Sequence, residues 1–160
     1  MQKMDSEARA ALARIVTNER VAALATLRQG APLASLVSFL PQPDFSGFVL
    51  RLSRLAWHTQ DMEKDARVSL MIAERDDGRA DPQTLARVTL RGEILRLPAG
   101  DAAFGQLKGA WLARFPEAAV TFELADFSFW RLAPRGARFV AGLGRTYNLS
   151  AADLQAACAA

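Results

Sequence analysis

The chain has 160 residues, of which 51% are apolar and 23% are charged, and its 20 basic and 17 acidic side chains give a formal net charge of +3. A chain of this length buries roughly 70% of its unfolded surface in one domain, so we expect a single domain over residues 1–160. This apolar content argues against intrinsic disorder, and the small charge surplus does not indicate nucleic acid as a partner. No apolar run approaches the roughly 20 residues of a membrane-spanning helix, so we expect no membrane partner.

The counts of cysteine and histidine bear on the compartment and on metal binding. Cys158 is the single cysteine, so the chain can form no internal disulfide and no cysteine-based zinc site, which suits a reducing cytoplasm. His58 is the single histidine, and the carboxylates gather in predicted loops. We therefore expect neither a metal site nor a hydrolase site of the Ser-His-Asp type.

The first part of the chain predicts a helix followed by a β-hairpin. Apolar residues recur at helical spacing from Ser6, the expected N-cap, to about Asn18. Residues 21–27 and 32–40 have the composition of strands, and residues 28–31 between them have that of a turn. Two antiparallel strands therefore open the predicted fold.

The middle of the chain predicts two further strands on either side of a short helix. After a proline-containing loop, residues 47–53 favour a third strand. Residues 55–65 change to helical spacing, and Thr59 offers a capping oxygen. Residues 68–73 are apolar enough for a central strand, whereas residues 74–82 are hydrophilic and predict a loop.

A long strand and a helix are predicted next. Residues 87–97 alternate apolar and polar side chains, which is typical of a strand with one buried face, and Gly92 is expected to mark a bulge. Residues 102–115 return to helical spacing, and Pro116 is expected to end that helix.

The final part of the chain predicts two strands and a terminal helix. Residues 127–132 and 137–140 are predicted as separate strands around a turn at 134–136, and Ser150 is placed to cap the helix together with Asp153. The chain thus has about seven strands joined mostly by tight turns rather than by regular crossover helices. This pattern favours a mainly β or α+β fold, an antiparallel barrel with peripheral helices.

Basic and polar side chains gather where the third strand ends and the short helix begins. Phosphate binding needs positive charge and donors at such a junction, and the free amides of the first helical turn supply more donors. The sequence has no glycine-rich dinucleotide motif and no P-loop. The alternative is purely structural: Thr59 caps the helix, His58 packs on the barrel rim, and the two arginines are solvated. The residues concerned are Arg51, Ser53, Arg54, His58 and Thr59.

The segment from Leu50 to Met62, followed by residues 65–70, resembles the signature of the FMN-binding split-barrel family related to pyridoxamine 5'-phosphate oxidase. The pattern of a Ser, a Leu-Ala pair, His-Thr and a short acidic helix resembles most the branch grouped with haem-utilisation proteins. Residues 30–37 are similar to the first flavin-contacting strand of that branch, and residues 81–92 are similar to its central strand. The similarity runs in colinear order over residues 15–145.

The resemblance implies a bound FMN with its ring against one strand and its phosphate at the strand-to-helix junction. The residues implied to line the flavin ring are Ser35, Leu36 and Val37. The residues implied to hold the phosphate are Ser53, His58 and Thr59, with Arg51 nearby on the same strand.

The resemblance also implies a homodimer with the cofactor at the twofold interface. Arg87 would approach the ring from a neighbouring strand, and Arg145 could reach the flavin of the partner. The oxidase proper uses an Arg-Lys pair where this chain has Trp57 and His58, so we do not expect oxidation of pyridoxamine phosphate. With one histidine in the sequence, no residue stands out as a haem ligand.

These observations lead to three hypotheses. The first is an FMN-binding, flavin-dependent oxidoreductase of unknown small-molecule substrate, linked to haem utilisation, in which the cofactor carries the electrons. The second is a module without enzymatic activity that sequesters flavin or haem. The third uses the arginines and tryptophans for nucleic acid, but these residues are scattered rather than interleaved in one stripe.

Overall fold

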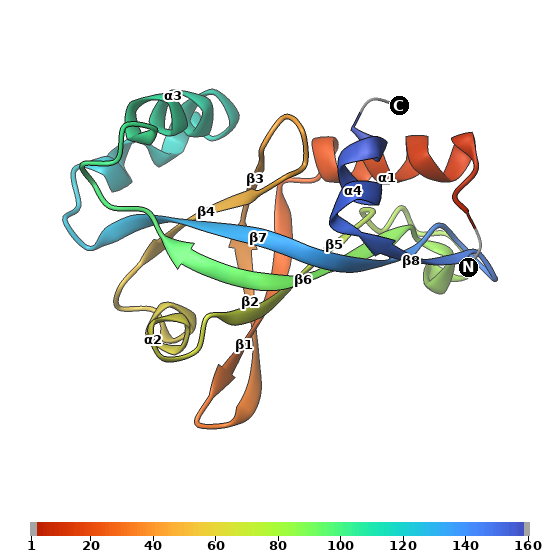
Figure 1. Cartoon of the computed structure of the whole chain (residues 1–160), viewed down its shortest axis with the longest axis horizontal. Coiled ribbons are helices and arrows are strands. Elements are labelled where there is room, and N and C mark those ends of the chain that lie inside the picture. Colours follow the sequence, from red (N-terminus) through yellow and green to blue (C-terminus); the bar gives the residue numbers. More distant parts are fainter. Residues whose placement is uncertain (1–2, 159–160) are drawn as a thin grey trace.

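The computed structural model describes residues 3–158, in which eight strands form a single antiparallel sheet (Figure 1). Seven strands lie in the order β2-β1-β5-β6-β7-β4-β3, and β8 pairs with β7. Because β2 also approaches β4, the sheet curls into a half-barrel, and the predicted antiparallel split-barrel class is confirmed. The strands are β1 (Val21–Arg28), β2 (Ala31–Ser38), β3 (Leu40–Pro41), β4 (Phe48–Ser53), β5 (Arg67–Ala73), β6 (Arg87–Arg96), β7 (Phe127–Val140) and β8 (Thr146–Ser150).

The helices lie at the periphery of the sheet. Helices α1 and α4 contact each other over one end of it, and α3 lies over the opposite end (Figure 1). Helix α2 packs against β1 and β2. No helix among the described residues is both long and apolar enough to cross a membrane. The helices are α1 (Ser6–Asn18), α2 (Trp57–Lys64), α3 (Phe104–Arg114) and α4 (Ala151–Ala157), with 3-10 turns η1 (Pro82–Thr84) and η2 (Pro116–Phe122).

Strand β4 separates two apolar clusters. Its side chains alternate between the two faces of the sheet, and every residue except Ser53 is buried. Phe48, Leu50 and Leu52 belong to the main core inside the half-barrel. Val49, on the other face, belongs to a second cluster that attaches α3 and η2 to the sheet, together with Trp111, Phe115 and Phe129. We call residues 104–122 the α3–η2 segment.

Two of the predicted caps are wrong and one is confirmed. The N-cap of α1 is Asp5 rather than Ser6, because the Asp5 Oδ1 accepts a hydrogen bond of 2.8 Å from the amide of Ala8. Thr59 lies inside α2, whose N-cap is Ala56 without a side-chain bond. The cap of α4 is confirmed: the Ser150 hydroxyl and the Asp153 carboxylate form a reciprocal capping box.

The predicted break in the late strands is also wrong. Residues 127–140 form one continuous strand, β7, which pairs with β6 along most of its length. On its other side β7 pairs with β4 as far as Leu132 and with β8 from Gly136. Pro134 lies in the gap between these two ladders, where the missing N–H group costs little. A bulge occurs beside Gly92 as predicted, but its extra residue is Arg135 of β7, since Arg91 pairs with Gly136 and Gly92 pairs with Pro134.

Strand boundaries and strand number differ from the predictions in smaller ways. The second strand ends at Ser38, and a separate short strand, β3, follows after Phe39. Strand β8 was not predicted, so the sheet has eight strands rather than about seven. The helix before Pro116 ends as predicted, but a tighter 3-10 helix, η2, continues from that proline.

Candidate functional site

A cavity of about 270 Å³ lies between the sheet, helix α2 and the α3–η2 segment. It contains four of the residues predicted from the sequence, contributed by β2, β4 and α2. Its walls are mostly apolar, and none of the described residues that line it is acidic. The lining residues are Leu36, Val37, Ser38, Arg51, Leu52, His58, Trp111, Ala118, Thr121 and Phe127.

Arg51 is a buried cation in the wall of this cavity. Alternation along β4 turns it to the same face as Val49, toward the α3–η2 segment, and the residue is 8% exposed. Its Nε donates to the Thr121 hydroxyl at 3.2 Å and its Nη2 donates to the Thr121 carbonyl at 2.9 Å. The guanidinium carbon lies 3.6 Å from the ring centroid of Phe122.

The Arg51 guanidinium has no carboxylate partner among the described residues. Its Nη1 also has no hydrogen-bond partner among them. Burial lowers the pKa of the Arg51 guanidinium from its ordinary value, although an arginine stays protonated in proteins. A buried cation that is hydrogen-bonded on one side and unpaired on the other favours an anion at the unpaired side.

His58 lies in the first turn of α2 and is half-buried in the cavity wall. Burial lowers the pKa of its imidazole from the ordinary value of 6.5, and the nearby charge of Asp61 opposes this effect in part. The neutral form therefore predominates at pH 7. A neutral imidazole can donate one hydrogen bond or offer a nitrogen lone pair to a metal.

A buried carboxylate holds α2, and with it His58, against the sheet. Asp61 is 3% exposed, and it accepts hydrogen bonds from the Thr26 hydroxyl and from Arg28 Nη1, each at 3.0 Å. The guanidinium of Arg28 also lies 4.2 Å from the ring centroid of Trp57. Thr26 and Arg28 both belong to β1, so these hydrogen bonds hold α2 against that strand, beside the cavity.

The two hydroxyls predicted to hold a phosphate have different surroundings. Ser53 donates to the Asp126 carboxylate at 2.5 Å and accepts from the amide of Leu55, so its single hydroxyl proton is not available to a phosphate. The Thr59 hydroxyl is buried and has no partner. It follows His58 in α2, but Thr59 does not line the cavity.

Two further predicted residues, Ser35 and Arg87, do not line the cavity. Ser35 pairs with Leu24 within the hairpin, and Arg87 donates to the backbone carbonyls of Gln83 and Leu85. Neither residue contributes to the cavity wall.

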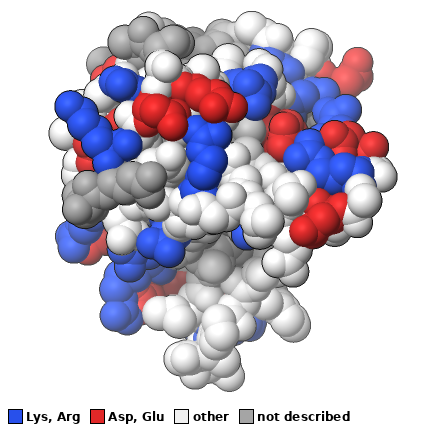
Figure 2. Space-filling model, turned by 90° about the vertical axis from the view of Figure 1, so that its right-hand side faces the viewer, with Lys and Arg blue, Asp and Glu red and all other residues white. Residues whose placement is uncertain are grey.

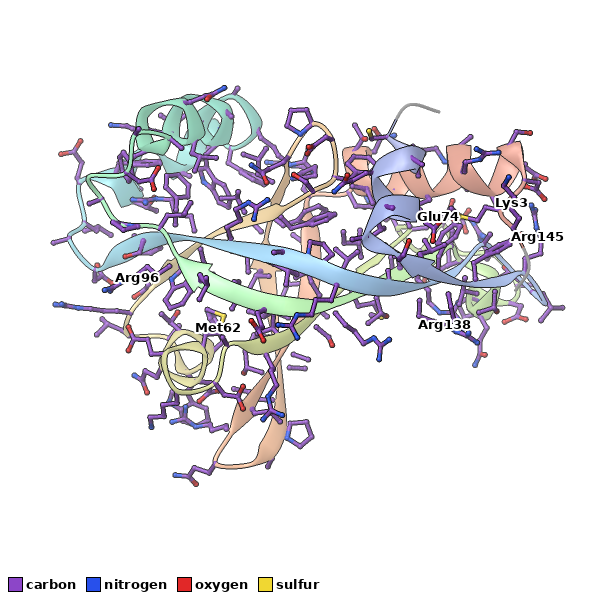
Figure 3. The ribbon with its side chains drawn as sticks, in the orientation of Figure 1. Lys3, Met62, Glu74, Arg96, Arg138 and Arg145 are labelled. Atoms are coloured by element: carbon purple, nitrogen blue, oxygen red, sulfur yellow. The ribbon has the colours of Figure 1, made fainter. Side chains whose placement is uncertain are left out.

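Arg145 also lies away from the cavity, at the other end of the sheet. It forms ion pairs with Asp5 at 2.9 Å and with Glu7 at 3.1 Å. Figure 3 shows it near Glu74, far from Met62 on α2. Figure 2 shows this end of the molecule, where basic and acidic side chains are interspersed. Arg145 could therefore approach the cavity only from a second copy of the chain.

A shallower groove of about 500 Å³ lies on the outer face of β1, β5, β6 and β7. It is lined by Arg67, Arg91 and Arg135, but also by Glu93, which pairs with Arg135 at 2.7 Å. None of the residues predicted for cofactor binding lines this groove. The smaller cavity, with its unpaired cation and its histidine, is therefore the candidate functional site.

Sequence reasoning missed the part of the site contributed by the α3–η2 segment. Trp111 and Thr121 line the cavity, yet Thr121 stands 70 residues from Arg51 along the chain. The sequence pattern predicts a helix around Trp111 and makes no prediction for Thr121, because a contact over that separation leaves no local signal. The buried role of Asp61 was missed for the same reason, since its partner Thr26 lies 35 residues earlier.

The chain matches the family described as CREG, beta-barrel, over residues 4–154. The chain belongs to the CREG β-barrel family. A solved structure from Clostridium acetobutylicum, described as a protein of the pyridoxinephosphate oxidase family, shares this fold at 13% identity, with a TM-score of 0.68 over 94% of this chain and 99% of that one. The resemblance to split-barrel proteins related to pyridoxamine phosphate oxidase is thus confirmed.

Three relatives of this CREG-family chain carry names that refer to haem. The chloroplastic heme oxygenase HOZ of Arabidopsis thaliana is 34% identical over 119 residues, which are 74% of this chain and 35% of the relative. The heme oxygenase HutZ of Vibrio cholerae is 28% identical over 127 residues, which are 79% of this chain and 71% of the relative. A heme binding protein from Mycobacterium smegmatis is 28% identical, with a TM-score of 0.83 over 98% of this chain and 62% of that one.

The predicted link to the haem-utilisation branch is therefore confirmed at the level of the relatives. The chain spans about a third of the length of the Arabidopsis relative and less than two thirds of the mycobacterial one.

Proposed function

We propose that this chain binds haem at the candidate site and acts in haem utilisation. The observation that carries the proposal is the buried Arg51 with its unpaired Nη1, which lines a cavity without acidic residues beside the single histidine of the chain. Haem combines an iron that accepts a nitrogen ligand, a flat apolar ring and anionic carboxylates. The names of the three relatives support the same assignment.

The residues present fit such a group. His58 in its neutral form would ligate the iron, and Arg51 would pair with a carboxylate. Apolar walls such as Val37 and Phe127 would contact the ring and exclude water. Leu36, in the cavity wall, and Trp57, next to His58 in the sequence, are 76% and 60% exposed and would offer further apolar contact. Bound haem would supply the redox chemistry of its iron.

A second candidate ligand is FMN, as the sequence analysis expects. The unpaired hydroxyl of Thr59 and the free amides of the first turn of α2 favour a phosphate near the strand-to-helix junction. In that case the chain would be a flavin-dependent oxidoreductase. The expected roles of Arg87 and Arg145 require a homodimer, because both residues lie outside the cavity of their own chain.

The proposal is tested by titrating the purified chain separately with haem, FMN and riboflavin while recording absorbance spectra. We expect a saturable shift of the haem spectrum, and we expect His58→Ala to weaken haem binding at least about 100-fold, since even residues that only support a metal ligand contribute 10- to 100-fold. Cys158→Ser is the matched control: it removes the single thiol of the chain and should leave the affinity unchanged.

Each other outcome has a defined meaning. Binding of FMN without binding of riboflavin, together with an unchanged haem spectrum, would reject haem and support the second candidate. If neither cofactor binds, both are rejected. Loss of the haem spectrum on addition of a reductant in air would indicate an enzyme, whereas a stable complex would indicate a sequestering module.

The pH dependence of haem binding gives a separate prediction. A proton competes with iron for the imidazole nitrogen, so affinity falls once pH drops below the pKa of His58. Because burial lowers this pKa from 6.5, affinity should be constant from pH 8 to about 6.5 and should decrease only at more acidic pH. Titrations across this range check the expectation, and a decline that begins above pH 7 would contradict it.

A further inference from the structure

Two residues that line the cavity each carry a buried hydrogen-bond donor without a partner. One is Arg51 Nη1 on β4, and the other is Trp111 Nε1 on α3. Trp111 is 3% exposed, and its ring is held by Phe115 and Phe129, with ring centroids 4.8 and 5.9 Å away. Arg51 and Trp111 therefore contribute to one cavity from the sheet and from the α3–η2 segment, and each carries a buried donor without a partner.

Leaving these donors unpaired has an energetic cost. A buried donor without an acceptor costs about 1–3 kcal/mol, and a charged donor costs more. The aromatic ring of Phe122 faces the Arg51 guanidinium and offsets part of this cost, but it leaves Nη1 without an acceptor. A ligand that brings an acceptor to both nitrogens would recover the lost free energy on binding.

We infer that Arg51 and Trp111 form a carboxylate subsite, and that the group bound there belongs to a flat, otherwise apolar molecule. The charge of Arg51 selects an anion, and the indole N–H adds one directed donor. Walls such as Val37, Leu52 and Phe127 favour an apolar body over a free, fully hydrated phosphate. Both nitrogens are buried, so the proposed subsite requires side chains in the wall to move when a ligand binds.

This subsite differs from the anion position expected from the sequence. That expectation relied on Ser53, His58 and Thr59, but the Ser53 hydroxyl is bonded to Asp126. The inference deepens the proposed function, because haem carries carboxylates of the kind that this subsite would bind. Its link to haem rests on that proposed function. The recognition of a carboxylate itself can be tested without haem.

The test uses benzoate as a flat carboxylate, with benzamide and inorganic phosphate as comparison probes. In the ¹⁵N-labelled full chain, indole N–H resonances report on each tryptophan separately. We expect benzoate to shift the Trp111 resonance in a saturable way. Trp130 is the internal control, because its Nε1 is equally buried and unpaired but lines a different groove, beside Met62.

Two matched variants complete the experiment. Trp111→Phe keeps the aromatic packing, removes the N–H and should weaken benzoate binding about tenfold, whereas Trp130→Phe should leave it unchanged. Arg51→Gln should weaken it further; because that change could also disturb folding, the comparison of the two tryptophan variants is decisive.

Several results would overturn the inference. These are equal binding of benzamide, a shift caused by phosphate but not by benzoate, equal shifts of Trp111 and Trp130, or no shift at all. Benzoate binding without haem binding would keep the subsite and reject the proposed function. Haem binding that is insensitive to Trp111→Phe, with no benzoate response, would keep the function and reject the subsite.

Discussion

Replacing Asp61 with alanine should lower the free energy of unfolding by about 2–3 kcal/mol, because a buried hydroxyl loses its acceptor and a partly exposed arginine loses its ion-pair partner. Arg28 would lose its carboxylate, and the buried hydroxyl of Thr26 would lose its acceptor. Equilibrium unfolding in urea measures the change. Since these bonds tie α2 to β1, the variant should also bind haem more weakly.

The matched control for this prediction is Asp65→Ala. Asp65 also pairs with an arginine, Arg67, at 2.6 Å, but that pair lies at the surface and the Arg67 side chain is 72% exposed. Exposed ion pairs contribute little, so this variant should unfold close to the wild-type urea concentration. Equal destabilisation by the two substitutions, or a fully stable Asp61→Ala protein, would show that the buried network does not hold α2.

The sequence analysis predicted those parts of the fold whose signals are local. Alternation over residues 87–97 identifies the long strand, and Gly92 within it marks the bulge. The Pro134 region was misread because a proline with a glycine two residues later, as in Pro134-Arg135-Gly136, often indicates a turn. The strand continues there because β6 pairs along it while its other neighbour changes from β4 to β8, and sequence alone does not reveal this exchange of partners.

The candidate site likewise has features that the local sequence predicts and features that depend on tertiary packing. The cluster of Arg51 and His58 was visible because both residues fall at one strand-to-helix junction, and the structure brings them into one cavity. Burial of Arg51 beneath Phe122 was not visible, since it depends on how the α3–η2 segment crosses the sheet. This packing contradicts the structural alternative, in which the arginines are solvated, because Arg51 is a buried cation in the cavity wall.

The second large effect is expected for Gly92→Ala, which should destabilise the chain by about 3 kcal/mol, at the upper end of the usual cost of overpacking. A Cβ atom at this position would lie 2.1 Å from the carbonyl oxygen of Ala133 and 3.1 Å from Leu132 Cδ1. The first of these neighbours is backbone, so relief requires β6 and β7 to separate at the bulge. Urea unfolding measures the loss of stability.

Gly109→Ala is the control that should act in the opposite direction. Gly109 lies inside α3, and a Cβ atom there would meet nothing within 4 Å, so alanine should stabilise the chain by about 0.5–1 kcal/mol through its higher helix propensity. Wild-type stability of Gly92→Ala would mean that the bulge relaxes without cost. The close approach of β6 and β7 at Gly92 would then not be required for β7 to remain one continuous strand through Pro134.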